Sequence, residues 1–195
     1  MKIQSICVYC GSSDDIHPSF YTAARNFGME MAARHIRLIF GGGKTGLMGA
    51  IAGGVLAGGG EVTGVVPENL NQPQLISDQL TGLEVTPDIQ SRKKRMQDLA
   101  DALIALPGGY GTFDELFEAL TWSQIGIHQK PIGVLNIDGY FDPLLLLIEH
   151  ARVEGFIYPE HSQLLIASNK PIELLDQLEN YQRPQNLERW VTREK

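Results

Sequence analysis

Short apolar runs alternate with longer amphipathic stretches along most of the chain. The runs are typical of buried β-strands, and they predict strands over residues 3–9, 36–40, 61–66, 83–86, 102–106, 131–136 and 164–167. In the stretches between them, apolar residues recur three and four positions apart, as on one face of a helix. This spacing predicts helices over residues 19–34, 47–57, 89–100, 143–153 and 171–180, and one that follows residue 112.

Strands that alternate with helices predict an α/β fold, a doubly wound parallel sheet with helices on both faces. The chain has 195 residues, enough for one domain with a full core. We expect this single domain to span residues 1–180, and we interpret residues 67–79 as an irregular polar lid or rim. A polar tail over 181–195 is expected to be loosely held, apart from Trp190.

A glycine-rich turn lies between the strand at 102–106 and the helix that follows it. It contains Pro107, Gly108, Gly109, Tyr110, Gly111 and Thr112. Glycine lets a ligand approach the backbone closely, and the first amides of a helix attract phosphate. A structural interpretation is equally open, because Thr112 followed by Glu115 fits a capping box.

A second glycine-rich turn, residues 41–46, follows the strand at 36–40. It is no P-loop, because that pattern needs a glycine where Leu38 stands. Gly41, Gly43 and Gly46 do satisfy the G-x-G-x-x-G pattern of dinucleotide-binding proteins, and Glu68 lies near the distance expected of a ribose-binding acid. An NAD-dependent oxidoreductase is therefore one hypothesis, and two adjacent loops that grip one mononucleotide are another.

Four basic residues, 92–95, open the helix before the central strand. Such a run is usually a solvated helix face. Arg92 is nearest the start of the helix and hence nearest the strand ends, where its planar fork suits a phosphate or a carboxylate. An arginine at this place that faces Glu115 would form a plausible active-site pair.

Net charge, cysteine count and apolar segment length indicate which ligands the protein can bind and where in the cell we expect it. The net charge of -7 argues against a nucleic-acid surface but allows a small anionic ligand in a locally positive site. Cys7 and Cys10 form a C-x-x-C pair, but no second pair completes a zinc site, so packing is the favoured role. No apolar segment is long enough to span a bilayer, and we expect a cytoplasmic protein.

Three motifs together resemble a known family. They are residues 41–49 with the sequence GGGKTGLMG, the pair Arg92-Lys93 with Met96, and residues 107–115 with the sequence PGGYGTFDE. The chain resembles the LOG ("Lonely guy") family, the cytokinin riboside 5'-monophosphate phosphoribohydrolases, whose members were often labelled lysine decarboxylases. The resemblance extends from Cys7 to about Phe156.

The resemblance implies a Rossmann-like fold and a homodimer or dimer-based oligomer. It implies hydrolysis of the N-glycosidic bond of AMP, or of N6-modified AMP, to a free base and ribose 5-phosphate. We expect no cofactor and no metal. On the matching positions Arg92 and Glu115 would be catalytic. The nucleotide would be bound by Lys93, Gly43, Thr121 and the loop Gly108, Gly109, Tyr110, Gly111 and Thr112.

Ile89 and Gln90 replace the Met-His that commonly precedes the Arg-Lys pair in this family, which bears on the choice of base. Three function classes follow. The favoured one is a nucleotide-cleaving hydrolase, in which the Glu115 carboxylate stabilises a cationic sugar and orients water. The others are a nucleotide or cofactor carrier without catalysis and the NAD-dependent oxidoreductase. No lysine can be singled out for Schiff-base chemistry with lysine as substrate.

Overall fold

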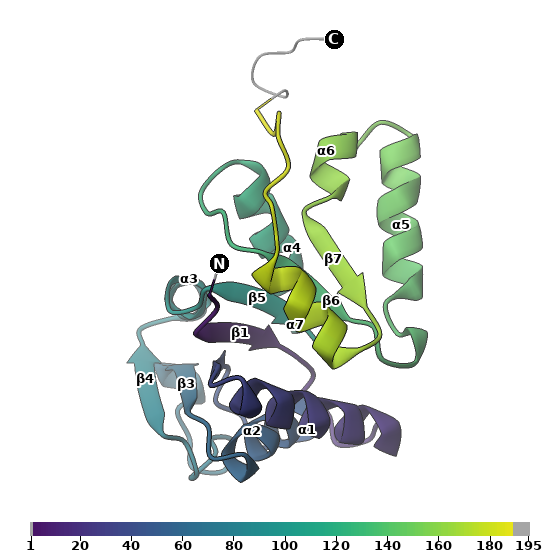
Figure 1. The fold of residues 1–195 in the computed structure, drawn as a ribbon. Coiled ribbons are helices and arrows are strands. Elements are labelled where there is room, and N and C mark those ends of the chain that lie inside the picture. Colours follow the sequence, from purple (N-terminus) through teal and green to yellow (C-terminus); the bar gives the residue numbers. More distant parts are fainter. Residues whose placement is uncertain (1, 189–195) are drawn as a thin grey trace.

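The computed structural model describes residues 2–188, so Trp190 lies outside the described residues. Within that range seven strands form one parallel sheet in the order β4-β3-β2-β1-β5-β6-β7. The strands are β1 (Ser5–Tyr9), β2 (Arg37–Phe40), β3 (Val62–Pro67), β4 (Gly82–Thr86), β5 (Ala102–Ala105), β6 (Ile132–Leu135) and β7 (Leu165–Ser168). The doubly wound α/β fold predicted from the alternating pattern is confirmed (Figure 1).

Helices connect these strands, with two short 3₁₀ turns among them. The helices are α1 (Pro18–Ala33), α2 (Gly46–Ala57), α3 (Ile89–Asp98), α4 (Tyr110–Gln124), α5 (Asp142–Val153), α6 (Pro159–Ser162) and α7 (Pro171–Glu179), and the turns are η1 (Glu68–Leu70) and η2 (Ile137–Gly139). The longer helices fall where the apolar spacing predicts them. Helix α6 is absent from the prediction, because four residues are too few to show a helical period.

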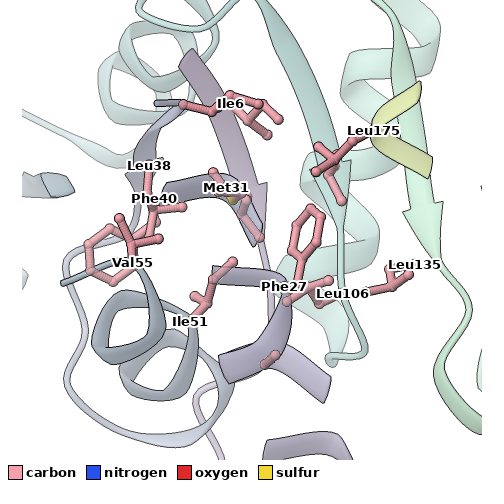
Figure 2. Packing of buried hydrophobic residues seen from close by; sticks show 14 of the residues in the cluster. Ile6, Phe27, Met31, Leu38, Phe40, Ile51, Val55, Leu106, Leu135 and Leu175 are labelled. Atoms are coloured by element: carbon pink, nitrogen blue, oxygen red, sulfur yellow. The ribbon is translucent and has the colours of Figure 1, made fainter. Parts of the chain in front are cut away.

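Side chains of the central strand alternate between two core layers. Ile6 and Val8 of β1 face a layer built with α1, α2 and α7, whose buried members include Phe27, Met31, Ile51, Val55 and Leu175 (Figure 2). Cys7 and Tyr9 face the opposite layer, built with α3 and α4 around Met96, Leu116 and Ala119. Because successive strand residues point to opposite faces, a sheet covered on both sides needs the continuous apolar strands seen here.

The sheet winds outward in both directions from β1 and β5. Cys7 of β1 pairs with Ile39 of β2 on one side and with Leu103 of β5 on the other. All strands are parallel, but the order in which the chain adds them changes side between β1 and β5: β2 to β4 follow on one side, and β6 and β7 on the other. In such folds ligands bind beyond the carboxyl ends of the strands at this switch point. The loops after β1 and β5 are therefore placed side by side at the expected position of a site.

Part of the C-terminal tail is fixed to the domain. Arg183 donates to the backbone oxygens of His128 and Ser123 at 3.0 and 3.1 Å, and the carbonyl of buried Leu187 is 2.9 Å from His161 Nε2. The expectation of a loosely held tail is corrected for residues 183–187 by these contacts. Across residues 2–188, every helix is too short or too polar to cross a bilayer.

Candidate functional site

A cavity of about 480 Å³ lies at the carboxyl ends of β5, β1, β2 and β3. Its walls come from segments far apart in the sequence. They are Cys10, Gly11 and Ser12 after β1, Gly41, Gly43, Thr45 and Met48 after β2, Val66, Pro67, Leu70, Leu75 and Ile76 at the end of β3 and beyond it, Arg92 of α3, and Gly109, Tyr110, Gly111, Thr112 and Glu115 of the α4 segment. The fold thus brings the three motifs to one place.

Helix α4 begins at the cavity wall. Its N-cap is Gly109, and within residues 2–188 no side chain caps this end of the helix. The amide of Phe113 donates to Gly109 O at 3.1 Å. The amides before Phe113 belong to the first turn and have no intrahelical acceptor. They carry the positive end of the helix dipole to the cavity, which suits a phosphate.

The capping-box interpretation, one of the two left open by the sequence, is wrong. Thr112 lies inside the helix, two positions after Tyr110, and its side chain is buried. A capping box needs the Thr at the N-cap, and Gly109 occupies that position instead. Glu115 is therefore not required to hold the start of the helix, and its carboxyl contacts Arg92.

The glycines of the central loop have two different reasons to be glycine. A Cβ on Gly108 would lie 2.1 Å from Thr112 Oγ1 and 2.7 Å from Gly11 N, so close packing against the β1 loop excludes a side chain there. A Cβ on Gly109 or Gly111 would meet nothing within 4 Å among the described residues. Both of these glycines line the cavity, where the lack of a side chain leaves the helix start accessible to a ligand.

In the second glycine loop, the amides at the start of α2 already donate hydrogen bonds to other parts of the protein. Asp14 Oδ1 accepts from the amide of Gly46 at 2.8 Å, and Gly11 O accepts from the amide of Leu47 at 2.9 Å. A carboxylate therefore holds the N-terminus of α2, the place that a pyrophosphate takes in a dinucleotide-binding protein. Gly41, Gly43 and Thr45 of this loop still line the cavity, while its hydrogen bonds hold it against the β1 loop.

Arg92 and Glu115 form a buried pair on the cavity wall. Arg92 Nη1 donates to Glu115 Oε1 at 3.1 Å, and Arg92 Nε donates to Val65 O at 3.1 Å. Only 15% of the Arg92 side chain and 10% of the Glu115 side chain are exposed. The second contact fixes the guanidinium beneath β3, so that α3 and α4 present the two charges to the same space.

Burial raises the pKa of Glu115 to about 7, against a lowering effect of the Arg92 guanidinium. The other nearby charges contribute in both directions: Asp114 and Glu118 raise the pKa, and Lys93 lowers it. A carboxyl with a pKa near neutrality can bind and release a proton at working pH, which is what general acid–base chemistry needs.

Gly41 makes room for the arginine. A Cβ on this residue would lie 2.2 Å from Arg92 Nη2 and 3.3 Å from the sulfur of Met48. The glycine that the sequence assigns to a dinucleotide-binding pattern is therefore explained by the space that the guanidinium occupies. The requirement is steric and local, and it links the second glycine loop to the Arg92–Glu115 pair.

Lys93 points away from this cavity. Its ammonium lies 3.0 Å from Asp114 Oδ2 and 2.8 Å from Glu118 Oε2, and 7% of its side chain is exposed. Thr121 is also elsewhere: its hydroxyl donates to Phe117 O, and its side chain lines a groove between α4, α5 and α6. Among the described residues of one chain, the geometry gives neither residue a direct contact with a ligand in the 480 Å³ cavity.

Cys7 lies in the core beneath the site, whereas Cys10 is partly buried and lines the cavity wall. Burial raises the pKa of both Cys7 and Cys10 far above that of a free thiol. The thiolate is the form that binds metal and attacks disulfides, so these thiols are in the unreactive form. The structure thus favours the packing interpretation of the C-x-x-C pair.

Comparison with known proteins agrees with the motifs. A family model described as "possible lysine decarboxylase" matches residues 48–178. The chain is 44% identical over 181 residues to the cytokinin riboside 5'-monophosphate phosphoribohydrolase LOG7 of Arabidopsis thaliana, covering 93% of this chain and 83% of that protein. The chain belongs to the LOG family. A rice LOG-family relative, the probable phosphoribohydrolase LOGL1, is 46% identical over 178 residues, with coverage of 91% and 80%.

Solved structures share the fold at lower identity. A molybdenum cofactor binding protein from Rippkaea orientalis superposes with a TM-score of 0.69 at 24% identity, over 92% of this chain and 98% of that one. The molybdenum cofactor carrier protein of Chlamydomonas reinhardtii gives 0.68 at 22% identity, over 91% and 98%. At such identities the likeness establishes the Rossmann-like architecture alone, because one fold hosts many functions.

Sequence reasoning missed the apolar side of the cavity. Met48, Val66, Leu70, Leu75 and Ile76 all line it, yet none stands in a predicted catalytic or binding role. Four of these five residues belong to the end of β3 or to the segment 67–79, which the sequence marks only as a polar lid or rim. The available signal was a pair of leucines and an isoleucine in an otherwise polar stretch.

Proposed function

We propose that this LOG-family protein hydrolyses the N-glycosidic bond of adenosine 5'-monophosphates, N6-substituted ones included, to a free base and ribose 5-phosphate. The observation that carries the proposal is the buried Arg92–Glu115 pair in the same cavity as the uncapped start of α4. The amides at the start of α4 suit a phosphate, and Glu115 places a carboxyl on the wall of the same cavity. The names of the relatives, which are phosphoribohydrolases, support the same reaction.

The reaction follows from the placement of the two groups. The phosphate binds the amides at the start of α4, and this remote binding aligns the ribose with Glu115, which follows Thr112 by about one helical turn. The bond between C1' and the base nitrogen breaks with its electron pair going to the base. The ionised carboxyl stabilises the cationic sugar and takes a proton from the attacking water, whose oxygen bonds to C1'. The departing base takes up one proton from solvent, and Glu115 returns its own proton to solvent, so that the carboxylate is restored.

Arg92 has two roles in this proposal. Its charge lowers the pKa of Glu115 and so increases the ionised fraction near neutral pH. Its bond to Val65 O holds the guanidinium in place while the sugar becomes positive. Gly109, Tyr110, Gly111, Thr112 and Gly43 form the remaining contact surface for the nucleotide.

Glu115→Gln tests the proposal, with Asp114→Asn as the matched control. Asp114 is the neighbouring carboxylate, but it is 62% exposed and bonds to Lys93 outside the cavity. We expect Glu115→Gln to lower kcat for AMP and for N6-isopentenyl-AMP by about 10²–10⁴-fold, the range typical of a lost general base. Asp114→Asn should keep most of the activity. Wild-type turnover by a folded Glu115→Gln protein would remove Glu115 from the chemistry.

Release of free base separates the hydrolase from its two alternatives. A carrier binds nucleotide without releasing base, and an oxidoreductase binds NADH saturably. The dinucleotide alternative is disfavoured by the Asp14 carboxylate, which fills the N-terminus of α2. Chromatography of AMP incubations, with titration of NADH by fluorescence, distinguishes the three.

We also propose that the chain forms a homodimer through α5 and the neighbouring part of α4. None of the residues of α5 is buried in the described chain, although the helix reads DPLLLLIEHARV. Leu146, Leu147, Phe156 and Ile127 are each more than half exposed, which is typical of an interface. Leu147→Asp should give a monomer in light scattering, and an unchanged mass would contradict this interface. A cytoplasmic location stays a prediction.

A further inference from the structure

The cavity has a polar end and an apolar end, and the sheet fixes the distance between them. The start of α4 follows β5, whereas Val66 and Pro67 end β3. β3 and β5 are separated by three strand intervals in the order β3-β2-β1-β5, or about 14 Å at the usual spacing of 4.8 Å. That separation suits a nucleotide whose phosphate lies at α4 and whose base lies at β3.

The base end is lined by apolar side chains. Leu70 and Leu75 keep 42% and 44% of their surface exposed, and Ile76 lies beside them on the cavity. Together with Met48, Val66 and Pro67 these three form what we call the apolar wall. None of the six side chains can donate a conventional hydrogen bond, and the Met48 thioether is only a weak acceptor.

The apolar wall is held firmly to the second glycine loop. Gly43 and Ile76 form an antiparallel bridge, the amide of Lys44 donates to Leu75 O at 3.1 Å, and the amide of Ser77 donates to Gly42 O at 3.0 Å. Lys44 Nζ also donates to Pro73 O at 3.0 Å. These bonds fix the backbone of the segment. The exposed leucines are therefore held in place on the cavity wall.

Ile89 and Gln90 do not line this cavity, although the sequence suggests them as determinants of the base. Resting on the proposed function, we propose that Leu70, Leu75 and Ile76 are specificity-determining residues that bind the N6 substituent of the base and favour an unhydroxylated alkyl group. A bare amino group gains no apolar contact there. A hydroxylated substituent would bury its hydroxyl against groups that give it no partner.

The expected selectivity follows from apolar recognition. Each methylene buried on the wall contributes several-fold to binding, so a five-carbon substituent should raise kcat/KM over AMP by at least about tenfold. Addition of one hydroxyl to that substituent should lower kcat/KM by about ten- to hundredfold, the range by which apolar pockets reject such isosteres.

The test compares AMP, N6-isopentenyl-AMP and its hydroxylated form in three proteins. These are the wild type, Leu75→Asn and the control Leu83→Asn, whose residue is 47% exposed on β4 and lines no part of the cavity. Leu75→Asn should reduce the preference for the unhydroxylated substituent at least about fivefold, whereas Leu83→Asn should retain it. Because Leu75 and Leu83 keep 44% and 47% of their surface exposed, circular dichroism should show both variants folded.

Two readouts keep this inference separate from the proposed function. Turnover gives kcat/KM, and calorimetry gives the affinity of each nucleotide without requiring cleavage. Cleavage with equal kcat/KM for all three nucleotides, or a preference that survives both Leu75→Asn and Leu70→Asn, would overturn the assignment of the wall. Binding that prefers the isopentenyl nucleotide but leads to no cleavage would support the wall and overturn the hydrolase.

Discussion

Replacement of the Glu115 carboxyl by an amide should change how stability depends on pH. Burial raises the pKa of this carboxyl from 4.5 to about 7, even with Arg92 beside it. The folded protein therefore binds a proton there more tightly than the unfolded chain does. The carboxyl contributes stability fully below pH 4.5, and this contribution is lost as pH rises through about 7.

The magnitude follows from the difference between the two pKa values. A difference of about 2.5, at 1.36 kcal/mol per pKa unit, amounts to about 3 kcal/mol of unfolding free energy. Wild type should lose this amount between pH 4.5 and about pH 8, and Glu115→Gln should not. The stability of Glu115→Gln relative to wild type should therefore grow by about 3 kcal/mol over that interval.

Urea unfolding at several pH values measures this difference. Glu84→Gln is the control, because the hydrogen bond from Arg95 lowers the pKa of the partly exposed Glu84. Its contribution should run in the opposite direction and be small, since exposed ion pairs are weak. A stability difference between wild type and Glu115→Gln that stays flat from pH 4.5 to about pH 8 would refute the reasoning.

Three further predictions concern the residues around this carboxyl. Arg92→Met removes the charge that lowers the pKa of Glu115, so the acidic limb of kcat/KM should move up by about one to three pH units, and an unmoved limb would contradict their coupling. Lys93→Met leaves the mostly buried Glu118 unpaired and should lower the unfolding free energy by about 3–5 kcal/mol in urea titrations; a loss below about 1 kcal/mol would argue against the ion pairs. Gly41→Ala should displace the guanidinium and reproduce the pH profile of Arg92→Met without loss of helical circular dichroism, whereas a wild-type profile would show that the arginine has room to move.

Most of the fold could be predicted from the sequence because its elements are long and strongly patterned. The strands are continuous apolar runs, as both faces of a parallel sheet require, and the amphipathic helices repeat at three and four positions. The sequence indicated a start of helix α4 at Thr112, but the helix begins at Tyr110, between Gly109 and Gly111. Packing of Gly108 against Gly11 fixes that start, and no local pattern reports it.

The candidate site could be predicted only in part. Arg92 and Glu115 were identifiable because a basic residue at a helix start and a carboxylate after a glycine turn both lie near strand ends. The partners of Lys93 could not be foreseen, since they depend on the angle between α3 and α4. Leu70 and Leu75 were missed because their position depends on backbone bonds to the loop 41–46, and those bonds leave no periodic trace in the sequence.

The pairing of β1 with β5 has a consequence for synthesis. Asp101, just ahead of β5, accepts hydrogen bonds from the amides of Gln4 and Ser5 at 2.8 and 2.9 Å, across nearly half the chain. Until that part of the polypeptide leaves the ribosome, β1 presents an unpaired edge that can recruit strands of other molecules. Nascent chains that stall before residue 101 should therefore be the form of this protein most dependent on chaperones.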